Sequence, residues 1–307
     1  MLPKTGRIGE VGISKWHGKM KIIKYTNVNN IIVEFNDKST LKTSYRTFKS
    51  GGVRKKLKRV GMTGTTNEGY KMKIIEYNSS KDVLIRLENG YEIRTEYKCF
   101  KNKGIRNPMH PSKYGVGFIG IGEYSSLGNT KKEKHCAEYI VWSDIIRRCY
   151  DPYYINKHLV YKDCVVCNEW KNFQNFAKWY KENYYEVEGQ RSEIDKDILS
   201  GAEKEYSPKN CCIVPKIVNT TIIDAKSFRG KFPVGVDFNK ASGKFRARIS
   251  CIKKSKSLGY FSNPIDAFYA YKKAKEKQIK NIARKYYGII PYKAYCALMS
   301  WEIKITD

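Results

Sequence analysis

The residues of this 307-residue chain whose types and spacing could do chemistry lie between Glu193 and Pro215, in EIDKDILSGAEKEYSPKNCCIVP. The pattern predicts a β-strand that ends at Asp195, a charged turn, and a second strand led by Asn210. A carboxylate and an amide carbonyl are hard oxygen ligands of the kind that bind Mg²⁺. Lys196 directly follows the carboxylate, and a lysine of ordinary pKa is protonated at pH 7 and accepts no proton. The stretch therefore raises the question of whether the protein cuts a substrate or only holds it.

The charge of the chain indicates the class of partner. Lysine and arginine exceed aspartate and glutamate by 29, while 41% of the residues are hydrophobic, which is typical of folded domains. Such an excess is best explained by a polyanion whose counterions are released on binding, so we expect double-stranded DNA as the partner. No apolar run approaches a membrane-spanning length, and Met1–Glu10 lacks the apolar core of a signal peptide. These features predict no membrane partner and a cytoplasmic protein.

The first hundred residues contain an internal repeat. Five residues of the first copy recur 52 positions later in the second: Met20, Tyr25, Tyr45, Phe48 and Gly52 return as Met72, Tyr77, Tyr97, Phe100 and Gly104. Alternating apolar residues in each copy predict half-buried strands joined by hairpin turns. We therefore expect two small β-barrel-like modules of the SH3-like kind, residues 1–56 and 57–108. The basic segment Val53–Gly61 joins them and is either a solvated linker or a strap on phosphates.

The middle of the chain is predicted to be helical after a connector. Residues 109–137 are rich in Gly, Pro and Ser and indicate a linker. One apolar stripe predicts a helix at Tyr139–Tyr150, and Arg147 and Arg148 lie outside this stripe, where they could contact DNA. A second stripe, of aromatic residues, predicts one continuous helix at Asn168–Asn183.

The nine cysteines have irregular spacing and do not form the pattern of a secreted disulfide framework. Cys164 and Cys167 form a CxxC motif. Cys149, Cys211 and Cys212 could lie near this motif in the fold. A structural Zn²⁺ and buried free thiols both remain open, and we favour free thiols because no second CxxC is present.

The last third predicts three short strands, GVDF, KFRARISC and KSLGYF, followed by a long helix that Asn263 caps and Pro264 begins. Four ordered matches, Gly235-Val236, Gly243–Ile249, Leu258–Phe261 and Asp266–Tyr271, resemble the AP2/ERF DNA-binding domain. That resemblance implies a three-stranded sheet in the major groove, with Arg246 and Arg248 facing bases and Lys244, Lys254 and Lys256 facing phosphates. Asp237 departs from the plant pattern, which often has arginine after Gly-Val, so the plant base preference is not transferred.

The block from Trp142 to Asn219, with RCY, CNEW, IDKD and SPKNC, resembles the HNH endonucleases common in bacteriophage genomes. Those homing endonucleases often pair the nuclease with an AP2-like domain, in the order found here. The resemblance implies a ββα-metal module in which Asp195 and Asn210 bind Mg²⁺ or Mn²⁺. It also implies a histidine general base directly after Asp195, where this chain has Lys196.

Three interpretations of Lys196 remain open. His158 or Asp197 could supply the base, a bound water could suffice for slow nicking, or catalysis could be lost while DNA binding persists. The sequence thus predicts an α+β multidomain protein: a nuclease module at 138–222, an AP2-like domain at 228–290 and a tail at 291–307. We expect a monomeric HNH homing endonuclease whose N-terminal repeats extend the DNA contact or bind a host protein. The alternative is a catalytically inactive DNA-binding regulator or anti-defence factor.

Overall fold

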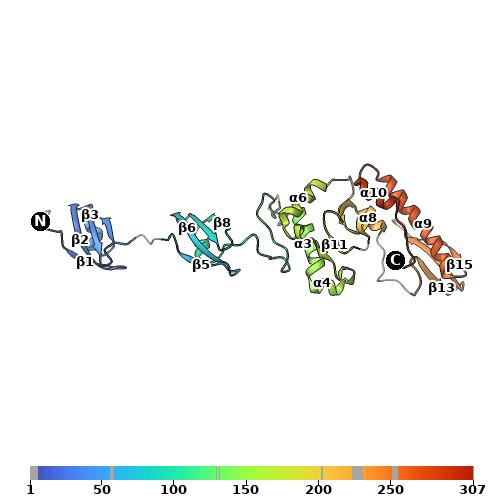
Figure 1. Ribbon diagram of the computed structural model, residues 1–307, viewed down its shortest axis with the longest axis horizontal. Helices are drawn as coiled ribbons and strands as arrows, with labels where there is room; N and C mark the ends of the chain where they lie inside the picture. Colours follow the sequence, from blue (N-terminus) through green and yellow to red (C-terminus); the bar gives the residue numbers. More distant parts are fainter. Residues whose placement is uncertain are drawn as a thin grey trace. The chain divides into compact units, whose positions relative to one another are not determined.

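The computed structural model describes residues 6–55, 59–128, 130, 132–201, 203–222, 231–250 and 255–306. They form two compact units, Met1–Asn107 and Pro108–Asp307, each described here by itself (Figure 1). Both contain small sheets and helices, which confirms the predicted mixed α/β class. Among the described residues, no helix has the length and apolar character needed to cross a membrane.

The first unit consists of two copies of one module. In each copy four antiparallel strands pair in chain order and a one-turn helix follows. The first copy contains β1 (Val11–Ser14), β2 (Gly18–Asn27), β3 (Asn30–Phe35), β4 (Thr40–Thr43) and α1 (Tyr45–Lys49). The second contains β5 (Thr63–Thr65), β6 (Lys71–Ser79), β7 (Asp82–Leu87), β8 (Glu92–Thr95) and α2 (Tyr97–Lys101).

The repeated residues build the same core twice. Phe48 and Phe100 are the buried residues of α1 and α2, and each enters a cluster of apolar residues from the inner face of its own sheet. A Cβ on Gly12 would lie 2.8 Å from the Phe48 ring, and one on Gly64 would lie 3.3 Å from the Phe100 ring. The absence of a side chain at these two glycines therefore lets the ring press on the edge strand in both copies.

The predicted β-barrel is wrong for the described residues, because both sheets are open. β1 and β4 are the edges of one sheet, and β5 and β8 are the edges of the other. Each edge strand is only three or four residues long and pairs on one side alone. The short helix, rather than a closing strand pair, covers the inner face, so closure is not required to bury the apolar residues.

The second unit begins with helices around small pairs of strands. Its first elements are α3 (Ala137–Tyr150), α4 (Pro152–Lys157), η1 (Leu159–Tyr161), β9 (Val165–Val166), α5 (Asn168–Lys171) and α6 (Phe173–Asn183). Next come β10 (Ser192–Asp195), α7 (Asp197–Ser200), β11 (Glu205–Tyr206), β12 (Cys212–Pro215) and α8 (Lys216–Ile222). β10 and β12 pair antiparallel, and β9 and β11 pair parallel.

The helix predicted at Asn168–Asn183 is two helices. Phe118 donates its amide to the carbonyl of Lys171 and accepts the amide of Phe173, so it interrupts the helix at Asn172. The Asn172 side chain then caps α6 by accepting from the amide of Gln174. The segment predicted as a connector thus lies against α6, where Ile119 and Tyr124 pack on the helical core.

The chain ends in a three-stranded antiparallel sheet and two helices: β13 (Val236–Asn239), β14 (Lys244–Ser250), β15 (Ser255–Phe261), α9 (Pro264–Lys285) and α10 (Tyr292–Met299). α9 lies along one face of the sheet (Figure 1). Gly235, at φ +75°, precedes β13, and a Cβ there would lie 2.1 Å from the Tyr271 ring. The Gly-Val motif therefore lets β13 start in contact with α9. The predicted tail is also part of this core, since Ala294, Leu298 and Ile303 are buried.

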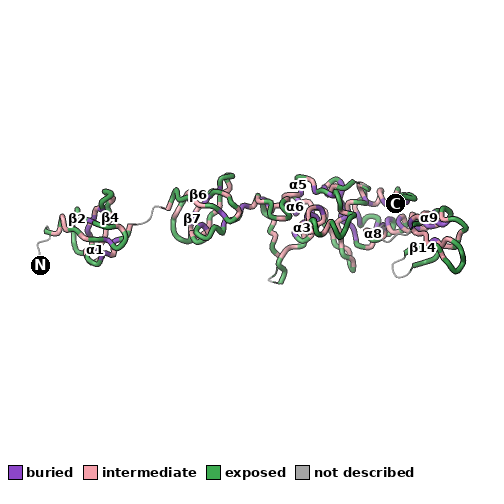
Figure 2. The backbone as a smooth tube through the Cα atoms, turned by 90° about the horizontal axis from the view of Figure 1, so that it is seen from below, coloured by how far each residue is buried: buried purple, intermediate pink, exposed green. Residues whose placement is uncertain are grey.

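β12 lies between the two cores of the second unit. Cys211 and Ile213 belong to the core of α3 and α6, whereas Cys212 and Val214 belong to the core that α9 and the C-terminal sheet complete. Every residue of β12 is buried, and Figure 2 shows buried positions in α3, α8 and α9. Residues on both sides of the predicted boundary between 222 and 228 thus share one core; 223–230 themselves lie outside the described residues.

Candidate metal and nucleic-acid site

The β10–β12 pair brings the two predicted metal ligands to the same end of the hairpin. Asp195 is the last residue of β10 and lies opposite Cys212 in the register. Asn210 lies two residues before Cys212, after the turn at Ser207-Pro208. Both side chains are buried, with 8% of Asp195 and 4% of Asn210 exposed. Two polar side chains buried at the same end of a strand pair need a chemical explanation.

Asp195 has a carboxyl group that burial makes costly to ionise. Burial, together with the charge of the neighbouring Asp197, raises its pKa to about 6, although the amide of Ile198 donates a 2.7 Å hydrogen bond to Oδ1 that favours the charged form. That bond also starts α7, so the carboxyl group is fixed in place. A cation beside it would favour the charged form, as expected of a metal ligand.

Asn210 is fixed through its amide nitrogen. Nδ2 donates to the carbonyl of Glu205 at 3.2 Å, and the backbone amide donates to Oγ of Ser207 at 3.3 Å. Within the described part of the chain, Oδ1 of Asn210 receives no hydrogen bond. The carbonyl oxygen is thus the atom that the local structure leaves for a ligand role, and the pair of side chains fits a hard divalent cation.

Lys196 is held as a cation by its neighbour. Nζ lies 2.5 Å from Oδ1 of Asp197 and 3.3 Å from the carbonyl of Glu203, and the side chain is 11% exposed. Burial alone would lower its pKa, but the hydrogen bond and charge of Asp197 outweigh burial, so the pKa lies above its usual value. Lys196 therefore stays protonated at neutral pH and does not replace a histidine base.

His158 lies at the end of α4 and is exposed. Its ring lies 4.4 Å from the Tyr154 ring and 6.5 Å from the Tyr161 ring, between centroids. No contact recorded among the described residues joins it to Asp195 or Lys196. The structure thus places the His158 ring against Tyr154 and near the edge of Tyr161.

Arg147 and Arg148 share a carboxylate that the sequence reasoning missed. Asp144 pairs with Arg147, and its Oδ2 lies 2.6 Å from Nη2 of Arg148. The guanidinium of Arg148 also lies 5.5 Å from the centre of the Tyr161 ring. The spacing i, i+3, i+4 on a helix is the signal that could have revealed this cluster. Both arginines are therefore held by a carboxylate of their own helix, and Arg148 also contacts an aromatic ring of η1.

The outer face of the C-terminal sheet carries the predicted base-contacting arginines. Ala247 and Ile249 are buried against α9, so Arg246 and Arg248, the alternate residues, lie on the opposite face, together with Lys244. Lys256 lies opposite Ile249, which places it on the helix-covered face of the sheet rather than with the arginines. Lys254 lies outside the described residues.

The cysteines near the CxxC are free and mostly buried. Burial raises the pKa of both Cys149 and Cys212 to about 12, so these thiols stay protonated at neutral pH. Throughout the residues that the structure describes, no group of three or more His, Cys, Asp or Glu side chains could hold a metal ion. The Asp195 and Asn210 pair is of a different kind, because a hard cation on it would complete its shell with water and phosphate oxygens.

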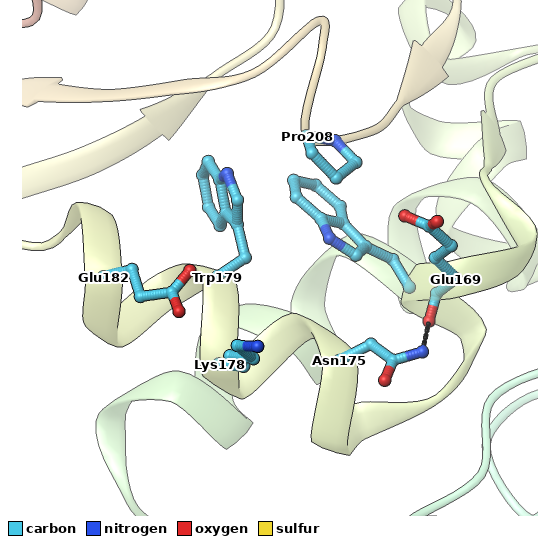
Figure 3. Close-up of a pocket in the computed structure, with 7 residues that line it drawn as sticks. Glu169, Asn175, Lys178, Trp179, Glu182 and Pro208 are labelled. Atoms are coloured by element: carbon cyan, nitrogen blue, oxygen red, sulfur yellow. Dashed lines mark hydrogen bonds between the residues drawn. The ribbon is translucent and has the colours of Figure 1, made fainter.

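A pocket of about 290 Å³ lies beside the turn that leads to Asn210. Figure 3 shows Pro208 of that turn across the pocket from Lys178 and Glu182, with Trp179 at its side. Glu169 completes the acidic part of the lining, and its main-chain carbonyl accepts a hydrogen bond from Nδ2 of Asn175. Two carboxylates in the lining disfavour a bound phosphate, so we do not assign this pocket to the metal site.

Comparisons of the chain with family models, with curated proteins and with solved structures found no match. The HNH and AP2/ERF resemblances therefore remain predictions that rest on the residues of this chain.

Proposed function

We propose that the protein is a metal-dependent endonuclease of double-stranded DNA, of the phage HNH type. The observation that carries the proposal is the pair Asp195 and Asn210, both buried at one end of β10–β12, where no described residue donates a hydrogen bond to the Asn210 carbonyl oxygen. The excess of 29 positive charges supports DNA as the substrate.

In this proposal Asp195 and Asn210 hold Mg²⁺ or Mn²⁺. The bound ion would neutralise charge on the scissile phosphate and on the leaving oxygen. Lys196, protonated and held by Asp197, would stabilise the same negative charge and would not remove a proton from water. Among the described residues no contact joins His158 to Asp195 or Lys196, so we expect slow nicking rather than fast double-strand cleavage.

The other parts of the chain would serve DNA contact. The outer face of β13–β15 would give sequence preference, and Arg147 would contact the backbone near the cut. The N-terminal repeats would extend the contact on DNA or bind a host protein, and the protein would act as a monomer in the cytoplasm of a phage-infected bacterium.

A second candidate is a catalytically inactive DNA-binding regulator or anti-defence factor. The Lys196–Asp197 pair favours this candidate, because it puts a permanent cation where the HNH pattern needs a proton acceptor. Such a protein would bind duplex DNA with a steep salt dependence and cut nothing.

Nicking of a supercoiled plasmid decides between the two candidates. The wild type is incubated with Mg²⁺, with Mn²⁺ or with EDTA, beside Asp195→Ala and the control Asp163→Asn. Asp163 is an exposed carboxylate of the same module, 3.5 Å from Lys204. If the protein is an endonuclease, the wild type and Asp163→Asn nick the plasmid in the presence of metal, and Asp195→Ala does not. Salt-sensitive binding without nicking in either metal would instead support the regulator.

A further inference from the structure

Asp237 holds both of the arginines on the outer face of the C-terminal sheet. It lies directly opposite Arg246 in the β13–β14 register. Its two carboxylate oxygens accept from Nε and Nη2 of Arg246, each at 3.0 Å, and Oδ2 lies 2.6 Å from Nε of Arg248. Asp237 and Arg246 have side chains about 30% exposed and Arg248 is 49% exposed, so the group faces solvent from a fixed position.

The atoms that Asp237 binds determine which atoms remain for a ligand. A guanidinium has five N–H donors in one plane, and the carboxylate takes the Nε side of both arginines. In Arg246 this side includes one N–H of Nη2, whereas Arg248 contacts Asp237 through Nε. Nη1 and the second N–H of Nη2 in Arg246, and Nη1 and Nη2 in Arg248, are not taken by Asp237. Two parallel donors of this kind match the O6 and N7 acceptors on the major-groove edge of guanine.

One carboxylate shared by two arginines does not cancel their charge, and the group keeps one net positive charge beside Lys244. A carboxylate that only weakened DNA binding could do so from any nearby position, and would not need to contact two guanidinium groups on their Nε sides. Fixed guanidinium planes lose less conformational freedom on binding a base than free arginines do.

We propose that Asp237 is a positioning residue that presents Arg246 and Arg248 to guanines in the major groove. The inference rests on the proposed DNA binding and deepens it, because it names the base that the sheet selects. Arg246 and Arg248 are two residues apart on one strand face, roughly 7 Å. This spacing is close to two base-pair steps, so the expected target contains two guanines within three base pairs.

The test is a selection from randomised duplex DNA with the full chain in EDTA, where no cleavage occurs. Wild type, Asp237→Ala and Asp237→Asn are compared with Asp266→Asn, which removes one negative charge from the same domain. Asp266 lies at the start of α9 and contacts Asn263, not the arginines. Affinity is then measured for the selected duplex, for unrelated duplexes and for the selected duplex with 7-deazaguanine, which lacks N7.

We expect the wild type and Asp266→Asn to select guanines and to lose roughly 5- to 100-fold in affinity for each guanine replaced. Asp237→Ala should lose this discrimination while its affinity for unrelated duplexes stays equal or rises, because a negative charge is gone. Asp237→Asn, which still accepts one hydrogen bond, should retain part of it. The 7-deaza duplex should bind the wild type as weakly as a mismatched duplex does.

Retained or increased guanine preference in Asp237→Ala would overturn the positioning role. An unchanged affinity for the 7-deaza duplex would overturn it as well, and this arm uses the wild type alone, so misfolding of a variant cannot obscure it. If the wild type binds duplex DNA without preferring guanine, the inference fails while the endonuclease proposal stands. If guanines are selected but plasmid is never nicked, only the endonuclease proposal fails.

Discussion

Replacing Asp195 by asparagine should stabilise the metal-free protein at neutral pH. Burial raises the pKa of Asp195 from 3.8 to about 6, and two pKa units correspond to about 3 kcal/mol. A raised pKa means that the folded state binds the proton more tightly than the unfolded chain does. The stabilisation from this proton is complete below pH 4 and is lost as the pH rises to about 6.

Asp195→Asn cannot ionise, and its Oδ1 can still accept the amide hydrogen bond of Ile198. At pH 7 in EDTA the variant should therefore be more stable than the wild type by up to about 3 kcal/mol. Near pH 4 the two proteins should be equally stable. Added Mg²⁺ should stabilise the wild type by mass action and should leave the variant unchanged.

Urea unfolding followed by tryptophan fluorescence measures these differences, because Trp142, Trp170 and Trp179 all lie in the helical core beside the hairpin. Asp163→Asn is the matched control and should change stability by less than about 1 kcal/mol, since its ion pair is exposed. A variant at Asp195 that is less stable than the wild type at pH 7 in EDTA, or that keeps the wild-type pH dependence, would refute the reasoning.

Three further changes test other parts of the structure. Gly235→Ala should destabilise the second unit by about 3 kcal/mol or more in urea unfolding, because its φ is +75° and the Tyr271 ring fills the space that a Cβ would need. The control Gly243→Ala, at φ +66° with open space around it, should cost about 1 kcal/mol in the same titration. Lys196→His should raise metal-dependent nicking at least about 10-fold over Lys196→Met if the missing base limits the rate, and equal rates would contradict this. Asp144→Ala should cost about 1–3 kcal/mol, because it leaves the two α3 arginines without their carboxylate; no loss in urea unfolding would show that the cluster is solvated.

Local patterns in the sequence were sufficient for much of the fold. The 52-residue repeat predicts two equal modules because Phe48 and Phe100 take the same place in their cores. The apolar stripe of α3 and the Asn263 cap of α9 were equally readable, since helical periodicity and capping depend on neighbours in the chain.

Contacts between distant segments were not predictable in this way. The break at Asn172 depends on Phe118, which is 54 residues earlier in the chain and carries no local signal of that contact. The pKa of Lys196 depends on how far the fold buries its side chain, which lowers the pKa, and on the contact of Nζ with Asp197, which raises it by more. The sequence named Asp195, Asn210, Arg246 and Arg248 as candidates, but their burial and partners required the three-dimensional structure.

The position of β12 between two cores has a consequence for the geometry of cleavage. One side of this strand belongs to the core of α3 and α6, and the other side belongs to the core of α9. If the proposed function is correct, the metal site and the DNA-contacting sheet are held at a fixed separation by this shared strand. The distance from the selected guanines to the cut would then be constant, and one base pair inserted between them would move the cut to the neighbouring phosphodiester bond at that same distance.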